Sequence, residues 1–389
     1  MPSQVRRCSA HKSLSRRSGL YNHLGRPFWV TSETRIKRIT RIIGTSVGGT
    51  VTLPQAVEAM NFRRVARPAA ANGPRGRQMP TKDDCKMESP GQEVLLGAHM
   101  SIAGGLPQAV RRAQDVGATA LQLFVKNPTQ WRGRSFDDAE VEAFRRGVLD
   151  ASLRTCVAHG SYLLNLASPA AEVRRKSVDG LADEWKRAGV LGLDWLVLHP
   201  GSHGGEGERV GLERVAEGIL AAVERSEGAV APLALESTAG QGNTLGYCFE
   251  HLRDLLGRLD GNVPVGVCLD TCHLFAAGYD LRDDEARDRV FAHFEALIGS
   301  DRLAVWHLND NKQNLGSHVD RHEHIGRGRI GLAAFRDIMR NPAWTSVAKI
   351  IETPKGDGIA WDRRNLDLLR RLAGSTEDFP AALSTEWEV

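Results

Sequence analysis

The chain has 389 residues, 41% hydrophobic and 25% charged, which is typical of a globular protein with one large domain or two smaller ones. No apolar run approaches the roughly 20 residues of a membrane-spanning helix, so we expect no membrane partner. The six cysteines form no C-x-x-C pair, so we expect neither a zinc knuckle nor a disulfide framework, and a reducing, cytoplasmic location is favoured.

The net charge of +4 is unevenly distributed along the chain. Residues 1–92 hold 17 Lys and Arg against five Asp and Glu, a net charge of +12, whereas residues 93–389 carry −8. The basic segment fits a disordered tail, an organelle import signal, or a start codon called too early, with Met79 or Met87 as the true start. We expect one folded domain over residues 93–389, whose acidity argues weakly against a simple electrostatic DNA clamp.

Short apolar runs recur at regular intervals from Val94 onward. They are continuous rather than alternating, as in strands buried on both faces. The eight predicted strands are Val94–Met100, Ala120–Lys126, Thr155–Ser161, Trp195–Pro200, Leu233–Ser237, Val265–Asp270, Leu303–Leu308 and Ala348–Thr353.

Amphipathic segments typical of helices lie between these runs, among them Glu172–Ala188, Gly211–Arg225, Asp284–Leu297 and Arg363–Leu372. Eight strand–helix repeats in this length predict an α/β fold, a (β/α)8 TIM barrel. A doubly wound sheet is the alternative, but it requires a Gly-rich phosphate turn after the first strand, which Ser101–Gly105 does not provide.

Metal-capable side chains stand where six successive predicted strands end. Barrel enzymes place their active sites at this rim. Any one of these residues could simply be a hydrogen-bonded polar group at a strand end, but six at one rim are costly to bury without a neutralising partner. The candidates are His159, His199, Glu236, Asp270 with the nearby His273, His307 with Asp320 and His322 in the following loop, and Glu352.

The size and chemistry of this set predict more than one metal ion. Five His, two Asp and two Glu exceed the four ligands of a single zinc, and a carboxylate such as Glu236 can bridge two ions. Closely spaced metals activate water and stabilise both oxygens of a phosphoester displacement, which favours phosphodiester hydrolysis. By contrast, His318 and His324, which flank the Asp320/His322 pair, are expected to be exposed, and Cys268 and Cys272 to be small buried hydrophobes.

From about Leu95 to Leu372 these residues resemble the endonuclease IV family of apurinic/apyrimidinic (AP) endonucleases. The Asp-Thr-Cys-His and Asp-Arg-His blocks are highly specific in combination. The matching stretches are Gly97-Ala98-His99-Met100-Ser101, Phe124-Val125-Lys126-Asn127 with Gln130-Trp131, His159-Gly160-Ser161-Tyr162-Leu163, His199-Pro200-Gly201-Ser202-His203, Glu236-Ser237-Thr238, Leu269-Asp270-Thr271-Cys272-His273, His307-Leu308-Asn309-Asp310, Asp320-Arg321-His322 and Glu352-Thr353.

The resemblance implies three zinc ions per chain and a monomeric DNA repair enzyme. Glu236, Asp270 and Glu352 are the catalytic carboxylates. By analogy the first ion is held by His159, His199 and Glu236, the second by Glu236, Asp270, His307 and Glu352, and the third by His273, Asp320 and His322. Mn²⁺ could occupy some of these sites instead, because His, Asp and Glu side chains bind it as well as Zn²⁺.

The implied reaction hydrolyses the phosphodiester 5′ to an abasic site in double-stranded DNA, as in base excision repair. It leaves a 3′-hydroxyl and a 5′-deoxyribose phosphate, and the family also trims blocked 3′ ends. Two other hypotheses stay open. One is a sugar isomerase or epimerase on the same barrel, for which the His273/Asp320/His322 cluster is surplus; the other is a non-catalytic binder of abasic DNA.

The resemblance also implies DNA contacts at the barrel rim. Tyr162 and Leu163 match a minor-groove wedge, which fits proteins that kink DNA and flip a nucleotide. Thr129 departs from the family, which often has an Arg at this position, so we expect weaker or differently achieved bending. The remaining predicted DNA contacts are His99, Asn127, Gln130 and Arg321, of which Arg321 either touches a phosphate or neutralises the acidic rim.

Overall fold

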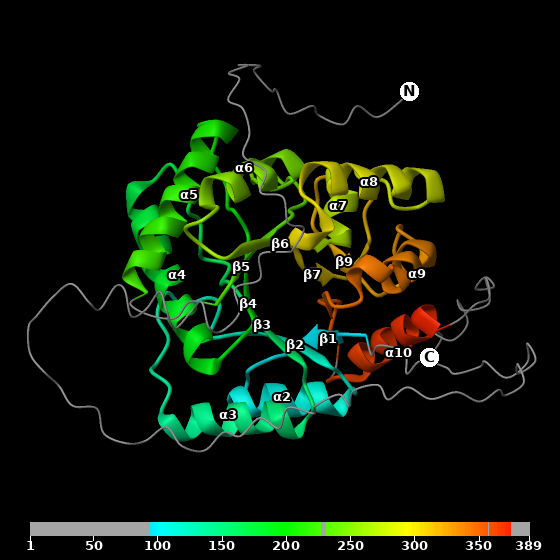
Figure 1. Cartoon of the computed structure of the whole chain (residues 1–389), viewed down its shortest axis with the longest axis horizontal. Coiled ribbons are helices and arrows are strands. Elements are labelled where there is room, and N and C mark those ends of the chain that lie inside the picture. Colours follow the sequence, from blue (N-terminus) through cyan, green and yellow to red (C-terminus); the bar gives the residue numbers. More distant parts are fainter. Residues whose placement is uncertain (1–93, 227–230, 357, 375–389) are drawn as a thin grey trace, which may run out of the picture. The chain divides into compact units, whose positions relative to one another are not determined.

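The computed structural model describes residues 94–226, 231–356 and 358–374 (Figure 1). The predictions made for residues 1–92 therefore lie outside the described residues. None of the described helices is both long and apolar enough to cross a membrane.

Eight parallel strands close into a barrel, which confirms the predicted TIM-barrel fold (Figure 1). The order around the barrel is β1-β10-β7-β6-β5-β4-β3-β2, so consecutive strands of the repeat are neighbours and the last strand pairs with the first. Each strand lies within one of the predicted runs. The barrel strands are β1 (Leu96–His99), β2 (Ala120–Phe124), β3 (Thr155–His159), β4 (Trp195–Leu198), β5 (Leu233–Glu236), β6 (Val265–Asp270), β7 (Leu303–His307) and β10 (Ala348–Ile351).

Helices surround the barrel (Figure 1). In the connection after β7, two short strands of two residues each pair in antiparallel fashion. All four helices predicted from periodicity are present, with bounds that differ by a few residues. The helices are α2 (Leu106–Asp115), α3 (Asp138–Asp150), α4 (Ala171–Leu191), α5 (Glu208–Arg225), α6 (Phe249–Leu259), α7 (Thr271–Ala277), α8 (Asp284–Leu297), α9 (Leu332–Arg340) and α10 (Ala360–Gly374), with 3₁₀ turns η1 (Ser300–Arg302) and η2 (Pro342–Trp344), and the hairpin strands are β8 (Asp310–Asn311) and β9 (His322–Glu323).

Local sequence sets several of these helix ends. The Asp137 side chain caps α3 by accepting from the Glu140 amide at 2.7 Å, and Asp283 caps α8 through the Ala286 amide at 2.8 Å. Helix α4 ends at Gly192, whose φ of 76° is in the left-handed region that glycine adopts without a steric penalty.

The buried core has two parts, separated by the strands. Leu and aromatic side chains on the outer strand faces pack against the helices, whereas a smaller cluster fills the barrel interior. The alternation along each strand assigns residues to the two faces: on β2, Leu121 and Leu123 belong to the outer core and Ala120 to the inner one. The inner cluster includes Ala120, Val157, Val197, Ala234, Cys268, Val305 and Ile350.

We predict that Gly97→Ala destabilises the barrel, because a Cβ at Gly97 on β1 would lie 1.7 Å from the Ala120 carbonyl oxygen on β2. The two strands would have to separate, so we expect a loss of about 3 kcal/mol or more, at or above the usual cost of overpacking. Urea unfolding measures the change. As a control, Gly257→Ala on the exposed face of α6 meets nothing within 4 Å and should stabilise by about 0.5–1 kcal/mol. Equal stability of the two variants would contradict the prediction.

Candidate metal centre

Each barrel strand presents one polar side chain to the interior. Seven of these lie at or just after the carboxyl end of their strand, whereas Gln122 lies in the middle of β2. Seven of the eight, all but His99, stand two positions beyond an inner-core residue. The same alternation that buries Ala234 on β5 therefore points Glu236 into the barrel mouth. The result is a ring of eight polar groups above an apolar floor. In chain order they are His99, Gln122, His159, His199, Glu236, Asp270, His307 and Glu352.

The first predicted ligand set is assembled around Glu236, which is fully buried. Its Oε2 lies 2.8 Å from His199 Nε2 and 3.2 Å from His159 Nε2. His159 Nδ1 is 2.7 Å from the Gly160 carbonyl. Because a carbonyl oxygen only accepts, Nδ1 carries the hydrogen and Nε2 is directed toward the carboxylate, as in metal-binding histidines.

The second predicted set surrounds His307 Nδ1. This atom lies 2.9 Å from Glu236 Oε1, 3.3 Å from Glu352 Oε2 and 3.9 Å from Asp270 Oδ2. Glu236 therefore directs one oxygen to each of the first two sets. That arrangement is what a carboxylate bridging two cations requires.

The third predicted set comes from α7, from the loop that precedes β9 and from β9 itself. Asp320 places Oδ2 at 3.1 Å from His273 Nε2 and Oδ1 at 3.2 Å from His322 Nε2. The other ring nitrogens face carbonyl oxygens, those of Ser237 at 2.8 Å and of Glu352 at 3.1 Å. Both Nε2 atoms therefore point at the same carboxylate.

The charges of this centre are compensated internally. Burial by itself lowers the pKa of His159, but its hydrogen bond to Glu236 and the charge of that carboxylate raise the pKa to about 9. Burial likewise acts to lower the pKa of His322, but the negative charges of Asp270 and Asp320 raise it to about 9. For Glu236, burial acts to raise the pKa, but the charges of His199 and His307 hold it well below its usual range.

The donor set fits divalent cations. Imidazole nitrogens and carboxylate oxygens are zinc and manganese ligands, and the ligand atoms of both the His159/His199/Glu236 group and the His273/Asp320/His322 group lie within 4.8 Å of one another. The buried Nε2 of His322 has no hydrogen-bond partner among the described residues, although it faces Asp320. A bound cation would satisfy this atom and replace the protons that now balance the carboxylates.

Cys268 and Cys272 lie next to these groups and are fully buried, as predicted. Burial raises the pKa of both thiols, which disfavours the thiolate form that binds metals. The prediction that His324 is exposed was wrong. Its ring is buried and stacks on Trp361 with centroids 4.2 Å apart, because α10 covers this loop. His318 is half-buried rather than exposed, with Nδ1 3.1 Å from the Ala239 carbonyl.

Two residues that sequence reasoning missed orient the ligands. Gln122 is fully buried; its Oε1 accepts from His307 Nε2 at 2.8 Å and its Nε2 donates to Glu352 Oε1 at 2.7 Å. Asn309 donates to Asp270 Oδ2 at 2.7 Å and accepts from the Glu352 amide at 2.7 Å. The signal for Gln122 was an amide interrupting an apolar run, two positions after the inner-core Ala120.

The predicted DNA contacts lie around the mouth of the barrel. Tyr162 is 73% exposed and its ring packs edge-on against Phe124 at 5.3 Å. Asn127, Gln130 and Arg321 are exposed, and Leu163 is half-buried. His99 differs from these, because its Nδ1 lies 3.2 Å from Glu352 Oε1, inside the ring of polar groups.

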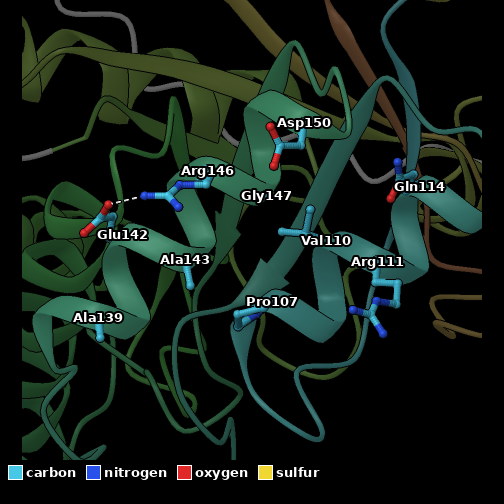
Figure 2. A pocket seen from close by; sticks show the side chains of 10 residues that line it. All are labelled: Pro107, Val110, Arg111, Gln114, Ala139, Glu142, Ala143, Arg146, Gly147 and Asp150. Atoms are coloured by element: carbon cyan, nitrogen blue, oxygen red, sulfur yellow. Dashed lines mark hydrogen bonds and ion pairs between the residues drawn. The ribbon is translucent and has the colours of Figure 1, made fainter.

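A cleft of about 370 Å³ opens over the metal-capable groups, lined among others by His159, Tyr162, His199, His273 and Asp320. A larger groove of about 520 Å³ lies elsewhere, on the outer helix layer between α2 and α3 (Figure 2). Its lining includes the Arg146–Glu142 ion pair and none of the predicted ligands. The metal-capable groups therefore line the smaller cleft.

Comparison with known proteins agrees with this geometry. A family profile described as "Xylose isomerase-like TIM barrel" matches residues 110–372. A protein named "Probable endonuclease 4" from Chloroflexus aurantiacus is 46% identical over 282 residues, covering 72% of this chain and 99% of that protein. A protein of the same name from Geobacter sulfurreducens is 46% identical over 280 residues, covering 71% of this chain and 94% of that protein.

Solved structures give the same picture. Endonuclease IV from Thermus thermophilus is 39% identical with a TM-score of 0.64, covering 71% of this chain and 98% of that one. A D-tagatose 3-epimerase-like protein matches at 17% identity with a TM-score of 0.52, which reflects the fold alone. Fold and rim together define a barrel enzyme with a polar centre at the carboxyl ends of its strands. The relatives make the assignment specific: the chain belongs to the endonuclease IV family, as its sequence motifs predicted.

We predict that Gln122→Leu lowers metal affinity by about 10- to 100-fold, as loss of a hydrogen-bonding partner of a metal ligand usually does. Leucine leaves His307 free to rotate and removes the donor to Glu352. Competition with a chromogenic chelator measures the affinity. Gln114→Leu on the exposed surface of α2 is the matched control and should bind metal like the parent protein. Parent-like affinity in Gln122→Leu would show that the amide does not orient the ligands.

Proposed function

We propose that the protein is a zinc-dependent DNA repair endonuclease. It hydrolyses the phosphodiester 5′ to an abasic site in duplex DNA, leaving a 3′-hydroxyl and a 5′-deoxyribose phosphate, and it trims blocked 3′ ends in base excision repair. The observation that carries the proposal is the third cluster, His273, Asp320 and His322, next to two ligand sets that share Glu236. Three adjacent cation sites suit a phosphodiester, whose nucleophile and leaving oxygen both need charge stabilisation.

The ligand assignment follows the contacts of the centre. His159 and His199 would hold the first ion with Glu236. His307, Asp270 and Glu352 would hold the second with Glu236, and the cluster at Asp320 would hold the third. When bound, such ions activate water and stabilise charge on phosphate and leaving oxygens. Mn²⁺ is an alternative occupant, since none of the ligands is specific to zinc.

The three catalytic carboxylates have separate tasks within this assignment. Glu236 aligns the first two sites by directing one oxygen to each. Asp270 accepts from the His273 amide at 2.9 Å and so ties the second site to the third. Glu352 lies where His99 and Gln122 both contact its Oε1, which leaves Oε2 facing His307.

The exposed rim supplies the DNA contacts in this proposal. Tyr162 projects from the cleft wall and, with Leu163, acts as the wedge that enters the minor groove. Asn127 and Gln130 approach from the neighbouring loop. Thr129 is held by the Asn127 side chain at 2.8 Å and is too short to enter the base stack. Arg321 stands beside Asp320 and is suited to a phosphate of the bound strand.

We expect Glu236→Ala to abolish incision, a loss of at least about 100-fold, because it removes a ligand of two cations at once. The assay is nicking of a labelled duplex with one abasic site, with metal content determined by elemental analysis. Glu217→Ala on the exposed face of α5 is the control and should cut like the parent. Near-normal turnover in Glu236→Ala would refute a bridging role.

A sugar isomerase or epimerase is the second candidate, because the matching family profile is described as xylose isomerase-like. The two candidates differ in what the third cluster is for. His322→Ala should lower the zinc content from about three ions per chain by one and abolish nicking of an abasic duplex. Turnover of a ketose by the parent, with nicking absent, would favour the isomerase. Tight abasic-DNA binding without cleavage by the zinc-loaded protein would instead indicate a non-catalytic lesion binder.

A further inference from the structure

One face of α4 contacts both loops that carry the proposed DNA-contacting side chains. The loop after β2 contains Asn127–Gln130 and the loop after β3 contains Ser161–Leu163. The contacting residues of α4 recur every three or four positions, which places them on one side of the helix. They are Ser177, Gly180, Glu184 and Arg187.

Glu184 connects the two loops directly. Its side chain is 1% exposed, and its two oxygens face different segments. Oε2 accepts from the Ser161 amide at 3.0 Å, and Oε1 pairs with Lys126 Nζ at 2.7 Å. Lys126, only 2% exposed, also donates to the Gln130 carbonyl at 2.7 Å. Glu184 and Lys126 therefore connect the Ser161 amide in one loop to the Gln130 carbonyl in the other.

The other residues of this face add contacts to the same two loops. The Ser177 hydroxyl accepts from the Asn165 amide at 2.9 Å. Gly180 leaves room for both loops at once, since a Cβ there would meet Leu164 Cδ2 at 3.0 Å and the Trp131 ring at 3.5 Å. Each loop is thus held on the helix by more than one contact.

Arg187 anchors the far end of the loop after β2. Its guanidinium donates to the carbonyls of Gly133 and Arg134, both at 2.8 Å, and lies over the Phe136 ring at 5.0 Å. Together with Lys126 it fixes this loop to α4 at both of its ends.

The buried Lys126–Glu184 ion pair need not stabilise the folded protein. Removing two charges from water is costly, and well-packed apolar side chains of similar volume often stabilise a fold as well or better. What the pair does supply is directional geometry, because each charge accepts or donates along fixed directions to backbone groups of two loops. Neither residue contacts the predicted metal ligands, so its effect on the reaction would be exerted through the loops.

We propose that Lys126 and Glu184 are positioning residues that hold the two rim loops in a single arrangement, an inference that rests on the proposed function. Gln130 and Tyr162 then meet a kinked duplex as one preformed surface. DNA binding need not order each loop separately, which preserves affinity for the distorted substrate.

The test is the double substitution Lys126→Met/Glu184→Leu, chosen because an apolar pair should keep the protein folded. We expect parent-like thermal stability and zinc content. For nicking of an abasic duplex we expect kcat/KM to fall by about 100-fold, the effect of a misplacement on the order of 1 Å, with most of the loss in KM. The matched control is Glu172→Leu/Arg175→Met, which removes an exposed ion pair of the same helix and should leave kcat/KM unchanged. Parent-like kcat/KM in the buried double variant would overturn the proposal.

A second measurement does not depend on DNA cleavage. In the DNA-free protein, Lys126→Met should accelerate amide hydrogen exchange in Ser161–Leu164, a loop to which Lys126 is linked through Glu184. Unchanged exchange there would overturn the coupling. If the zinc-loaded parent fails to nick abasic DNA while this exchange effect is present, the proposed function fails and the coupling of the two loops stands.

Discussion

The constraint on which this structure depends is the burial of three carboxylates in one ring at the barrel mouth. Glu236 and Asp270 are fully inaccessible, and Glu352 is largely buried. Isolated charges in such a place are prohibitively costly. Imidazoles surround them, and the neighbouring carboxylates raise the pKa of His159 and His307 although burial acts to lower it. Because these buried carboxylates require neighbouring positive charge, the ring is suited to bind cations.

The barrel makes this ring possible through alternation. Short strands of four to six residues place an apolar side chain inward and a polar one two positions further toward the barrel mouth. The inner floor of Ala, Val and Cys side chains brings the strands close enough for ligands from different strands to share one carboxylate. Outside the strands, helices such as α4 cover the barrel and, through Glu184, also hold the loops above it. The same helices therefore pack against the barrel strands and hold the loops at its rim.

Much of this could be predicted from local patterns. Continuous apolar runs with helical segments between them indicate buried parallel strands, and the metal-capable residues at the ends of six successive runs mark the rim. That reasoning failed where the deciding contact is long-range. Gln122 lies within a strand, and it joins the polar ring only because His307 and Glu352 reach it across the barrel. His324 follows a polar motif, yet Trp361 from the last helix covers it.

The sequence by itself determined the repeat of strand and helix, the fold class, the set of metal-capable residues and the family, because each depends on spacing and residue type along the chain. Only the tertiary structure decided which atoms share which partner. Glu236 divides its oxygens between two sites, Asn309 links Asp270 to Glu352, and Lys126 reaches Glu184 on a helix 58 residues further along. These are relations between strands and loops brought together by barrel closure, and residue spacing carries no information about their distances or directions.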